Sequence, residues 1–342
     1  MVKTNAGRFF EDYAPGQVIE HAVPRTVSGG ERALYHALYP ARGALYSSDE
    51  FARGCGLPMS PLDDLAGFHV VFGKSVPDIS LNAVANLGYA EGRFLQPVYA
   101  GDTLRSSSEV IGVKQNSNGK TGVVYVRTRG TNQRGETVME FVRWVMVRKR
   151  DVDADAPDTV VPELSKVVAA EDLPIPDGLD FSSYDFTQAG EEHRWGDYEI
   201  GEQIDHVDGV TIEEAEHMMA TRLWQNTAKV HFDATARPDG TRLIYGGHVI
   251  SLARALSFNG LANAQMIVAI NAGAHANPCL SGDTVRAWSE VLDKAETSAP
   301  GVGAVRLRLV ATKGDAFKLR GEDGKYLPEV LLDLDYWTLM PL

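Results

Sequence analysis

The chain repeats part of its own sequence. A first block of residues near the start returns 185 residues later, and a second block returns 181 residues later in the same order. The first block pairs Asp12, Tyr13, Gly16, Ile19, His21 and Thr26 with Asp197, Tyr198, Gly201, Ile204, His206 and Thr211. Two long copies indicate a duplicated domain, because a solenoid needs at least three shorter repeats.

The second block is the pattern Pro-x-x-x-Gly-Asp-Thr-x-Arg-x-x-Ser-Glu-Val, which begins at Pro97 and again at Pro278. The offsets divide the chain into a first copy over residues 1–150 and a second over residues 194–342. Residues 151–193 between them are acidic, contain four prolines and show no sustained hydrophobic period. That composition is typical of a linker that runs over the surface. The length of 342 residues fits two domains of about 150 residues each.

Both copies show the same order of expected elements. An extended segment precedes a helix, for which Ser28 with Glu31, and Thr211 with Glu214, have the spacing of a capping box. The apolar face of this helix should hold Ala33, Leu34, Ala37 and Leu38 in the first copy, and Ala215, Met218, Met219 and Leu223 in the second. A second, more apolar segment (residues 68–76 and 247–261) should be a buried central helix, and strands follow it. The pattern predicts an α+β fold in which an antiparallel sheet wraps around a helix, twice over.

Composition limits the classes of function. A formal net charge of −13 argues against a general nucleic-acid binder, although it leaves room for a local basic pocket. No stretch approaches the ~18 apolar residues of a membrane span, and the first residues lack an apolar signal core. We therefore expect a cytoplasmic protein without nucleic-acid or membrane partners. Cys55 and Cys279 fall at unrelated points of the repeat, which suggests neither a disulfide framework nor a metal site.

The copies differ where chemistry-bearing residues occur. After the first helix, the second copy has Asn226, His231 and Asp233 at the positions where the first copy has Ala41, Tyr46 and Ser48. One copy thus offers an amide, an imidazole and a carboxylate where the other offers a methyl group, a phenol and a hydroxyl. We predict that the second copy is catalytic and that the first has a binding or structural role.

These residues, together with the segment Tyr245-Gly246-Gly247-His248, resemble the MaoC-like, (R)-specific enoyl-CoA hydratase family. That family carries an Asp-x-Asn-Pro-x-His-x-Asp motif followed by a His-Gly turn at the start of the central helix. The resemblance covers nearly the whole chain and implies two tandem hotdog domains, a double hotdog. Residues 86–94 are most similar to the mesaconyl-CoA hydratases, also called β-methylmalyl-CoA dehydratases.

The resemblance implies roles for individual residues. His231 falls on the motif histidine, the acid/base, and Asp233 falls on a supporting aspartate. The backbone N–H of Gly246 or Gly247 would donate to the thioester oxygen. Asn226 replaces the catalytic aspartate, and an amide can orient a water molecule but cannot take its proton. Either His231 alone transfers the proton, or another carboxylate, from Asp233 or from the substrate, shares the work.

Four further residues are candidates for substrate binding. A C5 dicarboxylic substrate brings a charge that is costly to bury unpaired, so the acyl pocket should contain a cation. Arg42 and Arg222 lie beside the aligned segments and could converge there; the alternative for each is an arginine that is simply exposed to solvent. Tyr46, with a phenol pKa of about 10, should bind rather than act as a base. His248 aligns with His69 of the first copy, which leaves a structural role open.

The activity that the resemblance implies is that of a hydro-lyase interconverting mesaconyl-CoA and β-methylmalyl-CoA. No cofactor or metal is expected, since coenzyme A is part of the substrate, and the chain could form a homodimer. Three alternatives stay open: a general (R)-specific enoyl-CoA hydratase, an acyl-CoA thioesterase, and a non-catalytic acyl-CoA-binding protein. The last is open because the motif aspartate is missing.

Overall fold

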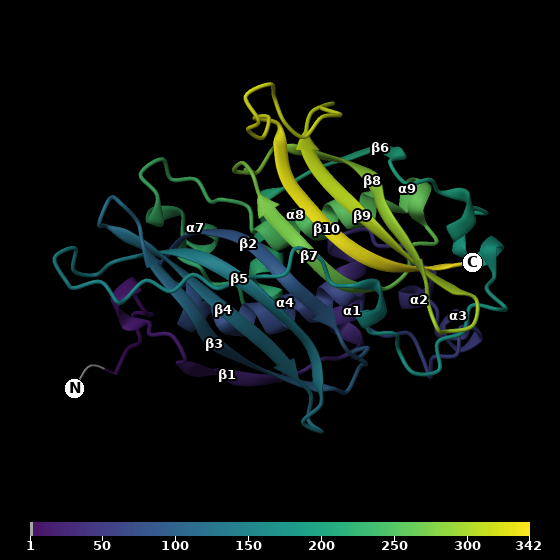
Figure 1. The fold of residues 1–342 in the computed structure, drawn as a ribbon, viewed down its shortest axis with the longest axis horizontal. Coiled ribbons are helices and arrows are strands. Elements are labelled where there is room, and N and C mark those ends of the chain that lie inside the picture. The colour runs from purple at the N-terminus through teal and green to yellow at the C-terminus, as the bar shows by residue number, and fades with distance from the viewer. Residues whose placement is uncertain (1–2) are drawn as a thin grey trace.

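The computed structural model describes residues 3–342, and in this part of the chain ten strands form one antiparallel sheet. The strand order is β1-β3-β4-β5-β2-β7-β10-β9-β8-β6, so each copy supplies five neighbouring strands. The two halves join where β2 pairs with β7, with Tyr89 opposite Gly273 (Figure 1). This arrangement confirms the α+β double hotdog.

The strands of the first half are β1 (Val18–Thr26), β2 (Ala83–Phe94), β3 (Thr103–Gln115), β4 (Thr121–Thr131) and β5 (Thr137–Arg148). Those of the second half are β6 (Gln203–Thr211), β7 (Ile267–His275), β8 (Thr284–Glu296), β9 (Val302–Lys313) and β10 (Val330–Pro341). The helices are α1 (Gly29–Leu38), α2 (Ala44–Ser47), α3 (Asp49–Gly54), α4 (Asp64–Ser75), α5 (Phe186–Ala189), α6 (Glu214–Leu223), α7 (Lys229–Phe232), α8 (Gly246–Leu256) and α9 (Phe258–Leu261). Short 3₁₀ or π turns are η1 (Phe10–Asp12), η2 (Val76–Ser80), η3 (Ala170–Asp172), η4 (Trp195–Asp197) and η5 (Ala234–Ala236).

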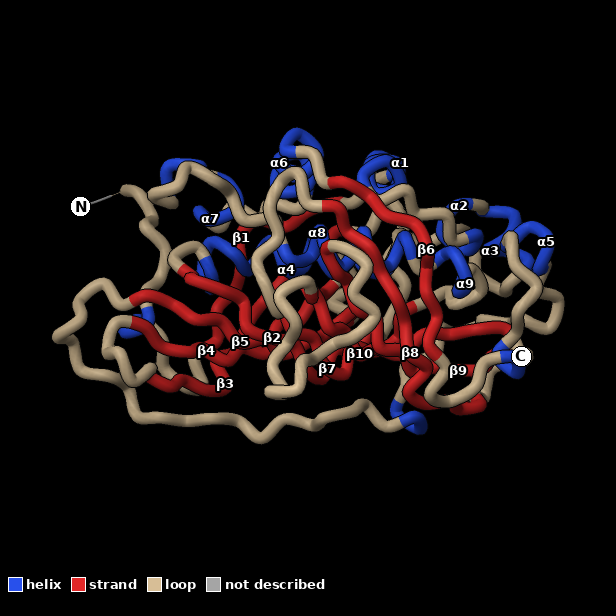
Figure 2. Tube along the Cα trace, turned by 90° about the horizontal axis from the view of Figure 1, so that it is seen from above, coloured by secondary structure: helices blue, strands red, loops and turns tan. Residues whose placement is uncertain are grey.

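The helices lie on one face of the curved sheet, and α4 and α8 occupy its centre (Figures 1 and 2). All residues of α4 are buried, as are residues 247–253 of α8, which confirms the two predicted central helices. The second ends earlier than the sequence suggested. Helix α8 ends at Leu256, and the short α9 (Phe258–Leu261) is interrupted, because Asn259 is not helical and Gly260 has φ 92°, in the left-handed region.

The central helices carry the contact between the copies. The His69 ring lies 5.3 Å from that of Trp224, and the His248 ring lies 5.2 Å from that of Tyr39. These two contacts are equivalent under the repeat. His248 is fully buried beneath α6, with Nε2 3.7 Å from a carboxylate oxygen of Glu216. The structure therefore gives His248 a place in the interface between the copies.

Helices α1 and α6 correct the predicted apolar faces. In α1, Ala33, Leu34 and Ala37 are exposed, and the buried side chains are Tyr35 and Leu38. In α6, Ala215 and Met219 are exposed, and the buried side chains are His217, Ala220 and Thr221. The periodicity of aliphatic residues therefore predicts the wrong buried face. The side chains that are buried include an aromatic residue and a histidine at the interface between the copies.

The two predicted helix starts have different outcomes. Ser28 and Glu31 form the expected capping box: Ser28 Oγ accepts from Gly30 N at 3.1 Å, and Glu31 accepts from Ser28 N at 2.7 Å. The box predicted at Thr211 is wrong, because α6 begins two residues later, behind Glu213. Thr211 instead ends β6 and contacts Thr284 across the strand pair.

Repeated polar residues outside the site hold strands and turns in place. His21 Nε2 lies 2.8 Å from Ser108 Oγ, and His206 Nε2 lies 2.8 Å from Ser289 Oγ. In the Gly-Asp-Thr turns, Asp102 accepts from Tyr99 N and Asp283 accepts from Leu280 N, both at 2.9 Å. The residues that make the repeat visible in sequence are thus largely structural.

The first part of the segment 151–193 crosses the face of the sheet opposite the helices, and its last part, with α5, lies near α2 and α3 (Figure 2). Val160 forms an isolated bridge with Val113 of β3, and Val168 N donates to Asn271 Oδ1 of β7 at 2.8 Å. Phe181 and Tyr184 are buried in a cluster with residues of both copies, and the Tyr184 ring lies 5.1 Å from that of Phe51. The segment has little regular structure, as its prolines suggest, but its hydrogen bonds fix it to both halves.

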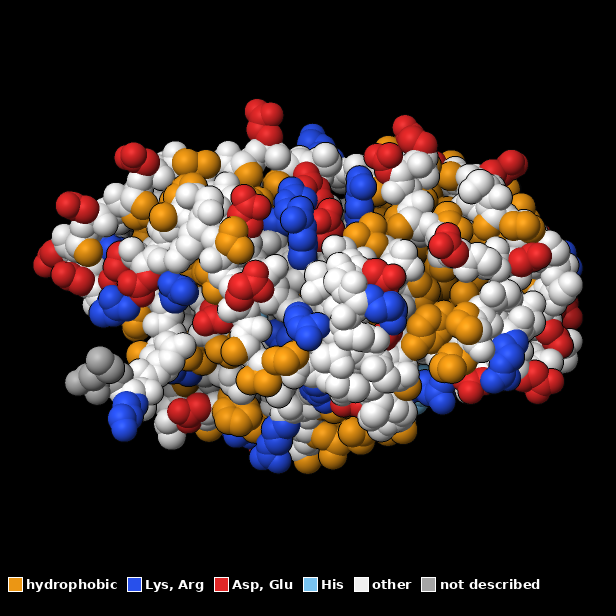
Figure 3. Space-filling view, turned by 90° about the horizontal axis from the view of Figure 1, so that it is seen from below, with side chains coloured by type: hydrophobic (Ala, Val, Ile, Leu, Met, Phe, Trp, Pro, Cys, Tyr) orange, Lys and Arg blue, Asp and Glu red, His pale blue; other side chains and the backbone are white. Residues whose placement is uncertain are grey.

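The surface carries both signs of charge. Figure 3 shows Lys and Arg side chains scattered among Asp and Glu side chains on one face, without a continuous basic patch there. Within residues 3–342, no helix has the length and apolar character needed to cross a bilayer.

Candidate active site

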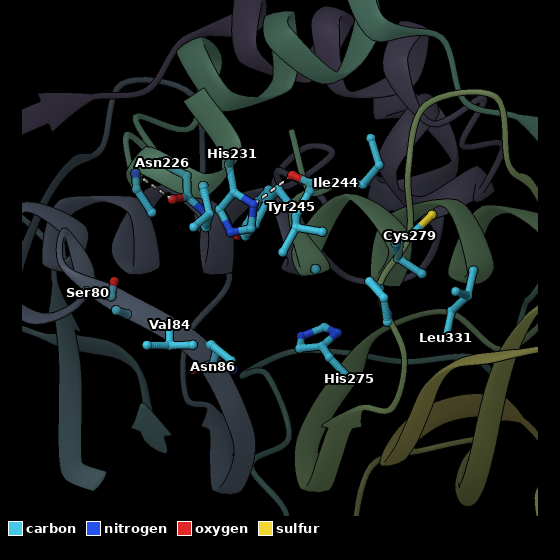
Figure 4. Close-up of a pocket in the computed structure, with 18 of the residues that line it drawn as sticks. Ser80, Val84, Asn86, Asn226, His231, Ile244, Tyr245, His275, Cys279 and Leu331 are labelled. Atoms are coloured by element: carbon cyan, nitrogen blue, oxygen red, sulfur yellow. Dashed lines mark hydrogen bonds between the residues drawn. The ribbon is translucent and has the colours of Figure 1, made fainter. Parts of the chain in front are cut away.

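A cavity of about 300 Å³ lies between the two copies and is mostly apolar. The second copy contributes α7, the start of α8 and the end of β7, whereas the first copy contributes η2, β2 and Arg143 of β5. Figure 4 shows side chains from both copies facing each other across this space. The walls therefore come from both halves of the duplicated chain.

His231 projects from the short helix α7 into the cavity. Its Nδ1 lies 2.8 Å from the carbonyl oxygen of Leu243, an acceptor, so Nδ1 carries the proton and Nε2 is left as a base. The backbone of Leu243 also donates to Val230 O at 2.9 Å, which fixes the segment against α7. Burial lowers the pKa of His231 below its ordinary value of 6.5, because desolvation disfavours the imidazolium. The ring is thus a neutral base at pH 7.

Asn226 is buried and lines the cavity beside His231, whereas Asp233 does not (Figure 4). Asn226 Oδ1 accepts a long hydrogen bond of 3.4 Å from Ala228 N. Helix α7 ends at Phe232, and Asp233 is exposed beyond it, where its carboxylate accepts from Thr235 N at 2.9 Å. The expectation that Asp233 supports His231 is not met by this geometry, because the helix end turns it outward.

Gly246 begins α8 and lines the cavity, whereas Gly247 lies behind it. The first N–H groups of a helix have no partner within the helix, and the dipole concentrates partial positive charge there. A Cβ at Gly246 would lie 2.4 Å from the His275 ring, and one at Gly247 would lie 2.4 Å from the Tyr245 hydroxyl. Both positions thus need glycine for close approach. Gly246 is the glycine whose backbone N–H can face a ligand.

His217 holds the start of α8. Tyr245 N donates to His217 Nε2 at 2.9 Å, just before Gly246. Burial lowers the pKa of His217 to about 3, so the ring stays neutral and can accept this bond. The hydroxyl of Tyr245 lies 3.0 Å from Nδ1 of His69 of the first copy. Sequence reasoning did not single out His217.

His275, at the end of β7, is a second imidazole in the cavity that sequence reasoning missed. It points toward His231 from the sheet side (Figure 4), and its Nε2 lies 3.2 Å from the Tyr89 hydroxyl. Burial lowers the pKa of His275 to about 4. A signal was present in the sequence, since the 181-residue offset aligns His275 with Phe94. This is another exchange of an inert side chain for an imidazole.

The predicted arginines lie outside the cavity. The guanidinium of Arg42 lies 4.4 Å from the centre of the Phe258 ring and borders other hollows, and Arg222 is exposed on α6. The expected meeting of Arg42 and Arg222 in the acyl pocket is therefore wrong. The cavity does contain a cation, Arg143, which reaches it from the middle of β5.

The site aligned with His231 in the first copy is filled. Tyr46 is buried there, and its hydroxyl donates to Asp64 and, at 3.3 Å, to the carbonyl of Gln265. The hollow beside it measures only about 30 Å³. Burial, followed by the charge of Asp64, raises the pKa of Tyr46 well above its ordinary value of 10.0. Tyr46 thus packs at the boundary between the copies and does not line the larger cavity.

Metal ligation has no support from the described residues. Within residues 3–342, no group of three or more His, Cys, Asp or Glu side chains is arranged to hold an ion. Cys55 and Cys279 are both buried free thiols, and Cys279 lines the cavity.

Comparison with known proteins places this fold and site in a class. A Mycobacterium tuberculosis protein described as having a double hotdog fold superposes with a TM-score of 0.78 at 25% identity, over 97% of this chain and 98% of that one. A MaoC domain dehydratase structure from Chloroflexus aurantiacus superposes with a TM-score of 0.97 at 57% identity, over 100% of this chain and 99% of that one. The chain is thus a MaoC-like double hotdog enzyme of the hydratase and dehydratase class.

The sequence narrows that class. The family described as mesaconyl-CoA hydratase matches residues 2–319. A mesaconyl-CoA hydratase of Cereibacter sphaeroides is 77% identical over 99% of this chain and 100% of its own length. A β-methylmalyl-CoA dehydratase of Chloroflexus aurantiacus is 57% identical over 99% of this chain and 98% of its own length. The chain belongs to the mesaconyl-CoA hydratase family.

Proposed function

We propose that this protein reversibly adds water to mesaconyl-CoA to give β-methylmalyl-CoA. The observation that carries the proposal is the free Nε2 of His231, held in a cavity beside the start of α8. The relatives named for this substrate and this product support the choice of acyl group. No cofactor is needed for the proposed reaction, because the thioester itself activates the double bond.

In the proposed reaction, His231 Nε2 takes a proton from a water molecule that Asn226 orients. The water oxygen forms a bond to the β-carbon as the carbon–carbon π bond breaks, and negative charge moves to the thioester oxygen. The N–H of Gly246 donates to that oxygen, reinforced by the dipole of α8. The imidazolium then returns its proton to the α-carbon, so that one water molecule is added overall and His231 is neutral again.

An incubation of the protein with a panel of enoyl-CoA and hydroxyacyl-CoA esters tests the proposal. We expect mesaconyl-CoA to gain, and β-methylmalyl-CoA to lose, the mass of one water molecule. Release of free thiol at the rate of substrate loss would instead indicate a thioesterase. Tight binding without any change in mass would indicate an acyl-CoA-binding protein.

A further inference from the structure

Arg143 is a fully buried cation without an anion. Its side chain is 0% exposed, and its guanidinium lies over the Phe72 ring with the central carbon 4.2 Å from the ring centre. It donates to two hydroxyls only, Ser75 Oγ at 2.7 Å and Ser80 Oγ at 3.4 Å, and its Nε has no partner within residues 3–342. The ionisable groups that act on it are tyrosines, and no carboxylate of the described chain is paired with it.

Such an arrangement is unfavourable by itself. A buried charge normally pairs with an opposite charge, because transfer from water into a low-polarity site is costly. Burial lowers the pKa of Arg143 to about 10, which reflects this cost but leaves the group charged at pH 7. The side chain thus offers a positive charge for which residues 3–342 supply no counter-ion.

The second half of the molecule provides an internal comparison. There the strand position equivalent to Arg143 holds Tyr336, and the buried arginine is Arg254 of α8. Arg254 donates to Ser257 Oγ at 2.9 Å and to the carbonyls of residues 264 and 265, and the charge of Asp63 acts on it. The arginine that lines the small hollow is therefore satisfied by hydrogen bonds within the protein, whereas the arginine that lines the large cavity is left without an anion in the described chain.

A second unpaired polar side chain lies in the same wall. Both the oxygen and the nitrogen of the Asn86 side-chain amide are buried and lack partners within residues 3–342. Asn86 lines the cavity from β2 (Figure 4), opposite Val145, which is two residues beyond Arg143 on β5. An amide donor and a guanidinium on one wall have the chemistry that binds a carboxylate.

We propose that Arg143, with Asn86, binds the free carboxylate of a dicarboxylic acyl-CoA and so selects this substrate class over neutral enoyl-CoA esters. The inference rests on the proposed hydratase function and deepens it. The bulky CoA moiety must extend toward solvent, so the carboxylate enters first, toward the wall formed by β2 and β5. Arg143 is here a specificity-determining residue, and proton transfer stays with His231.

Two thioesters that differ at one group test this role. In 2-methylcrotonyl-CoA a methyl group replaces the free carboxylate of mesaconyl-CoA. We expect Arg143→Met to lower kcat/KM for mesaconyl-CoA on the order of 10²- to 10³-fold, as for loss of one partner of a buried charge pair. The kcat/KM for 2-methylcrotonyl-CoA should change by less than about threefold, because a neutral acyl group has no charge to lose. Arg222→Met, an exposed arginine outside the cavity, is the matched control and should leave the ratio of the two unchanged.

Binding of saturated analogues separates this inference from the proposed function. Methylsuccinyl-CoA and 2-methylbutyryl-CoA cannot be hydrated, so their dissociation constants report recognition alone. Preference for methylsuccinyl-CoA that is lost in Arg143→Met supports the carboxylate site even if no thioester is hydrated. If Arg143→Met does not fold by circular dichroism, Arg143→Lys decides, since a shorter, non-planar cation should lower the preference about tenfold. Equal losses for the charged and neutral ligands, or an unchanged preference, would overturn the inference.

Discussion

Replacing His231 by alanine should separate catalysis from folding. The ring makes one hydrogen bond within the described chain, to Leu243 O at 2.8 Å, so its loss should lower the free energy of unfolding by about 1 kcal/mol. The ring borders an existing cavity, so its removal widens that space and creates no sealed void. Loss of a positioned acid/base should lower kcat by ~10² to 10⁴, which is about 3–5 kcal/mol of activation free energy.

Two measurements decide this prediction. Loss of enoyl-thioester absorbance gives the rate, and urea unfolding gives the stability. We expect a large fall in rate with a small fall in stability. A rate within about threefold of the wild type would refute His231 as the base. A loss of stability as large as the loss of transition-state stabilisation would show that the residue is structural.

The pH profile gives an independent check on the same residue. Burial lowers the pKa of His231 below 6.5, and the base is active in its neutral form. The value of kcat/KM should therefore fall on the acidic side with a midpoint below pH 6.5, as the pH drops through the lowered pKa. In the residual activity of His231→Ala this acidic limb should be absent. A limb centred above pH 6.5 would contradict a buried neutral imidazole.

Three further substitutions test neighbouring positions. Asn226→Ala should lower kcat about 10-fold or more by losing the group that orients water, whereas Asn226→Asp should retain activity with a changed pH profile; a wild-type rate in Asn226→Ala would make the residue a bystander. Gly246→Ala places a methyl group 2.4 Å from the His275 ring, which should displace the backbone N–H from the thioester oxygen and lower kcat by ~10² to 10³, as for loss of an oxyanion donor; full activity there would show that catalysis does not need the close approach at Gly246. Tyr46→Phe loses the hydrogen bond to Asp64, so unfolding should become easier by about 1–2 kcal/mol while kcat is unchanged; a collapse of kcat would mean that the first copy takes part in proton transfer.

The sequence could predict the double fold because the repeated residues make equivalent structural contacts in both copies. His21 and His206 contact equivalent serines, and Asp102 and Asp283 form equivalent turns. The turns are local, and the His–Ser contacts join strands far apart in the sequence, but each contact keeps the same residue types at nearly the same spacing in both copies. His231 could also be predicted from the sequence, because it differs from the aligned residue of the first copy within a segment that the resemblance covers.

The strand side of the cavity could not be predicted in this way. Arg143 lies in an alternating strand pattern, which does not reveal that Phe72 of α4 closes over it. Its role depends on which segments meet across the sheet, where Tyr89 of β2 lies opposite Arg143. The expectation that the acyl pocket contains a cation is met by Arg143. Arg42 and Arg222 were chosen instead of Arg143 because they are close in sequence to the aligned segments.

The two hollows show how a duplicated fold can place stability and function at different sites. Beside the smaller hollow, of about 30 Å³, Asp64 accepts from Tyr46 Oη and, at 2.7 Å, from Ile267 N, so the polar groups there satisfy one another. In the larger cavity, Arg143 and Asn86 keep unpaired buried groups, which lower stability unless a ligand completes them. Filling the larger cavity with apolar side chains would remove that cost but also the groups that recognise a charged substrate. The polar groups left unsatisfied therefore mark the cavity in which binding, and not stability, accounts for the side chains present.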